Sequence, residues 1–316
     1  MIAMVLAAGL GTRLRPLTER IAKPALPLFG TTLLGNNLAL VKRAGCDEVV
    51  VNAHHLPQTV AAAAREAAAA LGLRLHLSFE LPEVRGTGGA LVAARPLLDR
   101  GEPFLLVNGD VLTDVDPRPA IAAHFASGAD TTMVLRPMPE GAPFAPVEVD
   151  DRGLVARIAG LGRAVDDGER LRPFAFTGIH VLSRVIFDVL PMEGAPCVNR
   201  QGHVALIESG RKVLGHVEAG GSWSDVGTPE RYLQAHVDVL EGRCHLPGWP
   251  FGAVEREPGV WVHPEAAVDV KAVLRSPCWI GPAARVREGA EVGPRAVLLA
   301  GSIADGEIHD AVLQRA

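Results

Sequence analysis

Short apolar runs recur along residues 1–243, and segments of helical composition separate them. Most runs are continuous rather than alternating, which is typical of strands buried on both faces of a parallel sheet. The predicted strands are Met1–Leu6, Glu48–Asn52, Arg74–Phe79, Pro103–Val107, Thr131–Leu135 and Phe174–Val181. The predicted helices are Leu33–Ala44, Leu56–Leu71, Gly88–Leu98, Pro117–Ala126 and Pro229–Leu240. This alternation predicts an α/β domain with a mostly parallel sheet.

The pattern changes after Leu246, where glycine and proline become frequent and an apolar period of six residues begins. Aliphatic residues occupy Val262, Val268, Leu274, Ile280, Val286, Val292 and Leu298. A small residue follows each of them four places later, at Ala266, Ala272, Cys278, Ala284, Ala290, Ala296 and Ser302. These two registers predict a short hexapeptide β-solenoid with an aliphatic interior. We expect one domain at residues 1–243, and a linker with the solenoid at residues 244–316.

Composition narrows the class of protein. Apolar residues make up 48% of the 316 residues and charged residues 21%, which excludes a disordered or collagenous chain. The net charge of −5 provides no basic field for nucleic acid or an anionic membrane, so we expect neither partner. No apolar run is long enough for a membrane span, and no signal peptide is apparent. The four cysteines are far apart and form no metal or disulfide pattern, which favours reduced thiols and a cytoplasmic location.

A glycine-rich loop directly follows the first predicted strand. Bare backbone amides at Gly9 and Gly11 can approach a phosphate closely, and Arg13 and Lys23 add positive charge. A dinucleotide fingerprint is excluded because Leu14 replaces its third glycine and prolines follow. A Walker loop is excluded because no lysine follows Gly11. The segment therefore predicts phosphate binding of another kind.

Further candidate residues stand at the ends of predicted elements. Asp110 ends an apolar strand, at the edge where open α/β sheets bind ligands. Asp225 precedes a predicted helix, where an isolated aspartate is most simply a helix cap. His54 and His55 have no carboxylate or cysteine at ligand spacing, so we interpret them as a packed or surface pair.

The stretch from Leu6 to Pro27 closely resembles the signature of the sugar-nucleotide pyrophosphorylases, the sugar-1-phosphate nucleotidylyltransferases, and further matches follow in order over nearly the whole chain. The resemblance implies a Rossmann-like nucleotidyltransferase domain with a mostly parallel mixed sheet. It implies that Arg13 neutralises the pyrophosphate leaving group and that Lys23 bridges the nucleotide and sugar phosphates. It also implies nucleotide contacts at Leu6, Ala7, Ala8, Gly9, Gly11 and Thr12.

The later matches extend this implied site. Glu80, with Gly86 and Thr87, is implied to face the nucleobase, and Asp110 and Asp225 are implied to bind Mg²⁺. The remaining implied substrate contacts are Asn108, Gly109, Thr177 and Gly178. One departure concerns the Glu-Lys-Pro of many members, whose lysine binds the sugar phosphate and which is absent here. Arg157, Arg163 or Arg172 are the candidates to supply that charge.

The resemblance implies transfer of a nucleoside monophosphate from a nucleoside triphosphate to a sugar 1-phosphate, with release of pyrophosphate. The glycine-rich segment after Glu80, together with a C-terminal solenoid, favours a mannose-1-phosphate guanylyltransferase. The alternatives are UTP or dTTP with another sugar 1-phosphate, such as N-acetylmuramic acid 1-phosphate or glucose 1-phosphate. A catalytically silent regulatory subunit and an acyltransferase built on the solenoid also stay open. We expect a homo-oligomer, with the solenoid assembling subunits or supporting the catalytic domain.

Overall fold

The structure, a computed structural model, describes residues 1–139, 141, 144–218 and 220–314. Contacts divide the chain into two compact units. The first unit comprises Met1–Leu10, Asn37–Gly109 and Val115–Gly221, and the second comprises Gly11–Asn36, Asp110–Asp114 and Ser222–Ala316. A division by contacts does not test the predicted domain boundary at residues 243 and 244, which stays a prediction.

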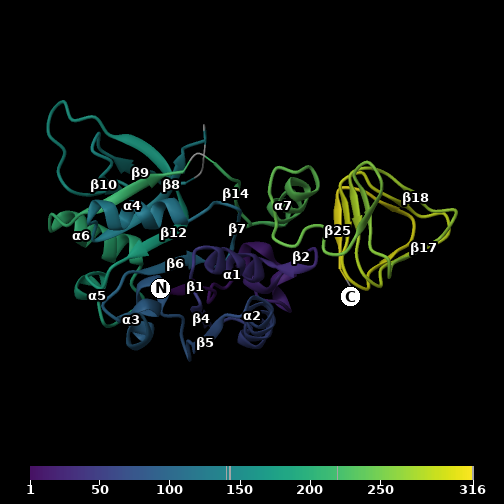
Figure 1. Cartoon of the computed structure of the whole chain (residues 1–316), viewed down its shortest axis with the longest axis horizontal. Coiled ribbons are helices and arrows are strands. Elements are labelled where there is room, and N and C mark those ends of the chain that lie inside the picture. The colour runs from purple at the N-terminus through teal and green to yellow at the C-terminus, as the bar shows by residue number, and fades with distance from the viewer. Residues whose placement is uncertain (140, 142–143, 219, 315–316) are drawn as a thin grey trace. The chain divides into compact units, whose positions relative to one another are not determined.

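The first unit is built on a mixed sheet of ten strands (Figure 1). Its centre is parallel, because β1 (Ile2–Leu6) pairs in parallel with both β4 (Glu48–Ala53) and β6 (Phe104–Asn108). β5 (Arg74–Phe79) extends this parallel part beyond β4. The central strands are buried on both faces, which explains their continuous apolar runs.

The other half of this sheet is largely antiparallel. β12 (Arg172–Leu182) pairs antiparallel with β6, β8 and β9. The remaining strands of this half are β8 (Thr131–Pro137), β9 (Val147–Val149), β10 (Val155–Ile158), β11 (Leu161–Gly162) and β13 (Val213–Val217). All six predicted strands are confirmed, and β9, β10, β11 and β13 are additions that the apolar pattern did not reveal.

Helices cover this sheet and complete the first core. All five predicted helices are confirmed with small differences at their ends, and α2 packs on β4 and β5. They are α1 (Leu33–Arg43), α2 (Pro57–Leu71), α3 (Gly86–Leu98), α4 (Arg118–Ser127) and, in the second unit, α7 (Pro229–Leu240). Two short helices, α5 (Ile186–Val189) and α6 (Val204–Glu208), and a π-helical turn at Val198–His203 were not predicted.

The second unit contains the predicted solenoid, drawn in yellow in Figure 1. Its strands form three parallel stacks. The first stack contains β16 (Val260–Val262), β19 (Cys278–Ile280), β22 (Ala296–Leu298) and β25 (Ala311–Leu313), the second contains β17 (Ala267–Val268), β20 (Arg285–Val286) and β23 (Ile303–Ala304), and the third contains β18 (Val273–Leu274), β21 (Glu291–Val292) and β24 (Glu307–Ile308). β15 (Val254–Glu257) pairs antiparallel with β16. All seven aliphatic positions of the six-residue register belong to the apolar interior, which confirms the solenoid.

The solenoid shares an apolar core with the rest of the second unit. Trp279 is fully buried, and its ring meets that of Phe29 edge to face with centroids 5.3 Å apart. The hydroxyl of Tyr232, on α7, donates to the carbonyl of Pro27 at 2.5 Å. These contacts tie the solenoid and α7 to β2 (Pro27–Leu28) and to the turn between β2 and β3 (Thr31–Thr32).

Candidate active site

A cluster of opposite charges forms around Lys23 in the second unit. The Lys23 ammonium lies 2.7 Å from Asp110 Oδ2 and 3.6 Å from Asp225 Oδ1. The lysine side chain is 7% exposed, whereas those of Asp110 and Asp225 are 44% and 19% exposed. The two carboxylates are therefore more accessible to a ligand than the buried lysine is.

Short strands bring these residues together from distant parts of the sequence. Lys23 begins a 3₁₀ turn at Lys23–Ala25, and Asp110 directly precedes β7 (Val111–Thr113). β14 (Trp223–Asp225) pairs antiparallel with β7, and its register places Asp225 opposite Val111. Asp110 and Asp225 therefore reach the same end of this two-stranded ribbon.

Gly11, in the glycine loop, packs against Lys23. Gly11 has a φ of +61°, and a Cβ built there would lie 3.1 Å from Lys23 Cβ, so the position favours glycine. Thr18 Oγ1 donates to the Gly11 carbonyl at 2.8 Å. A Cβ built on Gly227 would lie 3.1 Å from both Arg13 Nη2 and the Asp225 carboxylate oxygens. Arg13 and Asp225 thus border the same small space.

Arg231 is a member of this cluster to which the sequence analysis gave no role. Its Nη1 donates to Asp225 Oδ2 at 2.8 Å, so Asp225 lies between two cations. Thr228 Oγ1 accepts from the Arg231 backbone N–H at the start of α7, and this cap holds the first turn of the helix. The signal that could have found Arg231 is its place in that first turn, close after Asp225.

A second group of predicted residues lies at the carboxyl ends of the strands in the first unit. Ala7 follows β1, and its N–H donates to Asn52 Oδ1 at 2.7 Å. Asn52 Nδ2 donates to Glu80 Oε1 at 2.7 Å, and the Arg85 N–H donates to Glu80 Oε2 at 2.7 Å. Asn52 was not predicted, because a lone asparagine in a strand carries no motif.

The start of α3 is closely packed against the segment at residues 195–198. A Cβ on Gly86 would lie 2.7 Å from the Ala195 carbonyl oxygen, and the Gly88 N–H donates to the Pro196 carbonyl. Thr87 Oγ1 accepts from the Val198 N–H at 2.8 Å. These contacts give Gly86 and Thr87 a packing role within the first unit.

The predicted residues of β6 and β12 also lie together in the first unit. The Gly109 N–H donates to the Leu6 carbonyl at 2.8 Å. Gly178 has a φ of +87°, and a Cβ there would lie 2.9 Å from Asn108. Thr177 is buried, and its hydroxyl donates to the Val134 carbonyl at 2.7 Å. Of the other predicted residues, Ala8 is buried, Gly9 is open to solvent and Thr12 begins a 3₁₀ turn.

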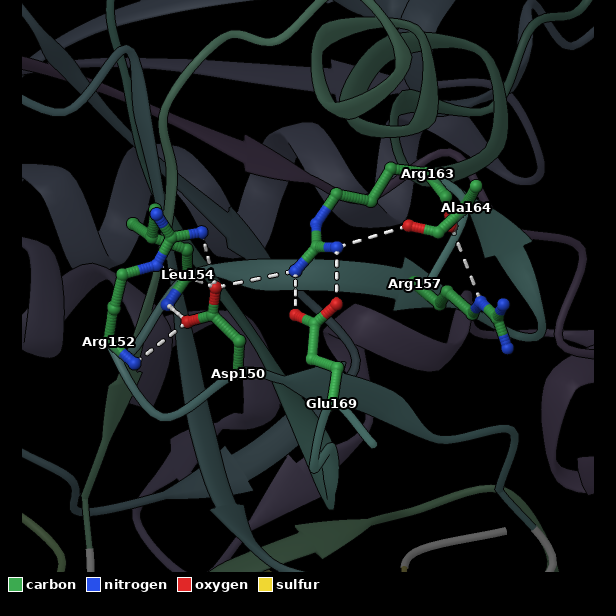
Figure 2. Close-up of polar contacts among 7 residues, drawn as sticks. All are labelled: Asp150, Arg152, Leu154, Arg157, Arg163, Ala164 and Glu169. Carbon is green, nitrogen blue, oxygen red and sulfur yellow. Dashed lines mark hydrogen bonds and ion pairs between the residues drawn. The ribbon is translucent and has the colours of Figure 1, made fainter. Parts of the chain in front are cut away.

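The three arginines considered for the missing lysine have different surroundings. Figure 2 shows the Arg163 guanidinium paired with Glu169 and, at 3.4 Å, with Asp150. These hydrogen bonds from Arg163 lower the pKa of the Glu169 carboxyl. The Arg172 guanidinium lies 5.8 Å from the centre of the Phe174 ring.

Arg157 has neither the carboxylate partners of Arg163 nor the aromatic ring beside Arg172. Its Nε donates to the Arg163 carbonyl at a long 3.5 Å, as Figure 2 shows. Among the residues that the structure describes, no carboxylate lies within 4.0 Å of its guanidinium. Of the three arginines, only Arg163 is therefore paired with carboxylates in the described part of the chain, and only Arg172 lies over an aromatic ring.

The cluster around Lys23 suits a hard divalent cation. Asp110 and Asp225 offer carboxylate oxygens that already converge on one positive charge, the Lys23 ammonium. Mg²⁺ is commonly held by one or two carboxylates while phosphate and water oxygens complete its coordination. Within the described ranges no group of three or more histidine, cysteine, aspartate or glutamate side chains forms a metal cage of its own. The two carboxylates therefore fit a metal that arrives with a phosphate substrate.

The fold and the arrangement of charges agree with the comparison to protein families. The model of the nucleotidyl transferase family matches residues 2–242, and the chain therefore belongs to this family. It is an enzyme of the sugar-1-phosphate nucleotidylyltransferase class, whose reaction uses a divalent metal.

Named relatives agree on this class and differ in substrate. A mannose-1-phosphate guanylyltransferase of Mycobacterium tuberculosis is 31% identical, over 96% of this chain and 80% of its own length. A UTP–glucose-1-phosphate uridylyltransferase of Synechocystis is 28% identical, over 98% of this chain and 82% of its own. An N-acetylmuramate α-1-phosphate uridylyltransferase of Neisseria meningitidis is 44% identical over 37% of this chain and 49% of its own.

One further finding concerns membranes. Within the described part of the chain, no helix combines the length and the apolar character that crossing a bilayer requires.

Proposed function

We propose that Asp110, Asp225, Lys23 and Arg13 carry out the nucleotidyl transfer. The observation that supports this most directly is the convergence of two carboxylates, one directly before β7 and one at the end of β14, on one buried lysine. Such an arrangement is costly for stability alone, because a buried ammonium needs paired carboxylates merely to offset its desolvation. A phosphate site gives these charges a function.

The bond changes are those of an in-line displacement at the α-phosphorus. An oxygen of the sugar 1-phosphate forms the new bond to this phosphorus, and the bond to the β-phosphate oxygen breaks to release pyrophosphate. No residue needs to act as a general base, because the attacking oxygen is already an anion. Positioning and charge neutralisation then do most of the catalytic work.

The residues of the second unit divide this work. Lys23 is proposed to bind both the α-phosphate of the nucleotide and the phosphate of the sugar, and Arg13 to neutralise the charge that develops on pyrophosphate. Asp110 and Asp225 are proposed to hold Mg²⁺, which when bound would polarise the phosphoryl oxygens. Arg231 is proposed to fix the Asp225 carboxylate through its 2.8 Å hydrogen bond.

Residues of the first unit are proposed to bind the base, ribose and sugar. The proposed contacts are Leu6, Ala7, Ala8, Gly86, Thr87, Asn108, Gly109, Thr177 and Gly178, while Gly9, Gly11 and Thr12 enclose the phosphates. Arg157 is proposed to supply the positive charge for the sugar phosphate, since within the described ranges its guanidinium has no carboxylate partner and, unlike that of Arg172, does not lie over an aromatic ring.

For the substrates we propose GTP and mannose 1-phosphate. The Mycobacterium tuberculosis guanylyltransferase, which aligns with 96% of this chain, supports this choice. A uridylyltransferase is the second candidate, favoured by the 44% identity to the Neisseria meningitidis relative over 116 residues. We further propose a catalytic domain at residues 1–243, a supporting or assembling solenoid in residues 244–316, a homo-oligomer and a cytoplasmic location.

The test is pyrophosphate release measured with GTP, UTP, dTTP, CTP and ATP against mannose, glucose and N-acetylmuramic acid 1-phosphates in Mg²⁺. We expect the highest kcat/KM with GTP and mannose 1-phosphate. A preference for UTP would move the assignment to the uridylyltransferases. Tight binding of a sugar nucleotide without release of pyrophosphate from any pair would support a regulatory subunit instead.

A further inference from the structure

A row of buried polar groups joins the carboxyl ends of three neighbouring strands, β1, β4 and β5. The Ala7 N–H donates to Asn52, Asn52 donates to Glu80, and Glu80 accepts from the Arg85 N–H, each at 2.7 Å. The Asn52 and Glu80 residues are 3% and 1% exposed. In open α/β sheets, ligands bind at this edge of the parallel strands.

Glu80 is held without a cationic partner. Among the described residues no lysine, arginine or histidine nitrogen lies within 4.0 Å of its carboxylate. Its two oxygens accept instead from an amide side chain and a backbone N–H. Because burying a carboxylate is costly unless it is well hydrogen-bonded, an apolar pair would be a simpler way to pack these strands.

The bonds of Glu80 hold two backbone segments. Through Asn52, one oxygen fixes the N–H of Ala7, where the chain leaves β1. The other oxygen accepts from the Arg85 N–H. The loop at residues 81–85 therefore starts directly after Glu80 in the sequence, and its last residue is bonded back to the Glu80 side chain. Leu81 and Val84 in this loop are 65% and 38% exposed, which leaves the loop's apolar side chains, and not the carboxylate, accessible.

We propose that Asn52 and Glu80 are positioning residues for the nucleotide. They fix the Ala7–Ala8 backbone and the loop at residues 81–85, and the Glu80 carboxylate does not itself contact the nucleobase. This inference rests on the proposed function, since it takes the Ala7–Ala8 backbone to be a nucleotide contact. It follows that a defect at Glu80 weakens the use of every nucleoside triphosphate by the same factor.

The hydrogen-bond pattern allows a reciprocal exchange. In Glu80→Gln the new amide must point its N–H groups at another donor, either Asn52 Nδ2 or the Arg85 N–H. In Asn52→Asp two carboxylates face each other. In the double variant, the new carboxylate at position 52 would accept from the Ala7 N–H and from the new amide at position 80, whose carbonyl would accept from the Arg85 N–H. All bonds and the net charge are then restored with the polarity of the middle bond reversed.

The test compares N52D, E80Q and the double variant, with Glu83→Gln, in the exposed part of the same loop, as the matched control. Equilibrium binding of GTP, UTP, dTTP and ATP and the kcat/KM for each are measured. We expect each single variant to lose about tenfold or more with every nucleotide, because a buried group loses its partner. The ratios between nucleotides should not change, and the double variant should recover most of the loss.

Three outcomes would contradict this inference, the proposed function or both. A change in the ratio between nucleotides in E80Q that the double variant does not reverse would place the carboxylate against the base and overturn the inference. Wild-type protein that binds triphosphates without transferring them would remove the proposed function, while the binding ratios would still decide the inference. Wild-type protein that binds no triphosphate would overturn both.

Discussion

Replacing Trp279 with alanine should destabilise the second unit as a whole, and not only the solenoid. The indole is fully buried, meets the Phe29 ring with centroids 5.3 Å apart, and donates from Nε1 to the Pro250 carbonyl at 3.2 Å. Phe29 stands in the turn that follows Lys23–Ala25 and β2. Removing the indole therefore removes a contact between the solenoid and the segment that carries Lys23.

The magnitude follows from burial. Truncation of a buried tryptophan to alanine costs about 3–5 kcal/mol through lost transfer energy and the cavity left behind. The Pro250 carbonyl loses its donor as well, which adds about 1 kcal/mol if water does not reach it. We expect a loss of about 5 kcal/mol, partly recovered by Trp279→Phe, and a decrease in kcat because Lys23 is less firmly held.

The assay is urea unfolding followed by circular dichroism, with each transition fitted separately if the two units unfold apart. Val270→Ala is the matched control, because Val270 is 96% exposed in the same solenoid and its truncation should change stability by no more than about 0.5 kcal/mol. If W279A loses no more stability than V270A, the shared core of the solenoid and the Lys23 segment is refuted.

Three further predictions concern charge. Arg13→Ala should lower kcat/KM for the triphosphate by about 10²-fold, as expected for loss of one electrostatic stabiliser, whereas the exposed Arg15→Ala should not; pyrophosphate release measures both. Arg157→Ala should raise KM for the sugar 1-phosphate and leave that for the triphosphate unchanged, so an equal rise in both would argue against its assigned role. Burial lowers the pKa of His203 to about 3 and that of His180 well below its ordinary value. Since the unfolded chain still binds these protons near pH 6.5, the stability present above that pH is lost as pH falls. For His203 the loss is about 2 kcal/mol between pH 7 and 5, and His180 adds to it in the same direction. Urea midpoints that stay constant over this range would contradict that linkage.

The sequence predicted the elements whose side chains form a repeating apolar pattern. β1, β4 and β6 were found because both their faces are buried, and the solenoid was found because its interior recurs every six residues. β7 and β14 were missed because strands of three residues show no period. Their pairing nevertheless places Asp110 and Asp225 side by side.

The sequence predicted individual residues of the candidate site, but not the side chains that contact those residues. Lys23, Asp110 and Asp225 were identified by resemblance, and their convergence depends on strand pairing that no local motif records. Asn52 and Arg231 were missed because each acts on a predicted residue from another element. The contact of Asn52 follows from which strand ends meet, whereas that of Arg231 follows from the turn that leads from β14 into α7.

The most direct test of the central claim is pyrophosphate release by Asp110→Asn and Asp225→Asn in Mg²⁺. Asp305→Asn is the control, since Asp305 pairs with Arg287 on the exposed solenoid surface. The account predicts that both site variants still fold, with a lower stability because Lys23 loses one of its charged partners, and lose at least about 10² in rate, while the control keeps wild-type activity. Near-normal pyrophosphate release from either folded site variant would contradict the assignment of these two carboxylates to the metal and the reaction.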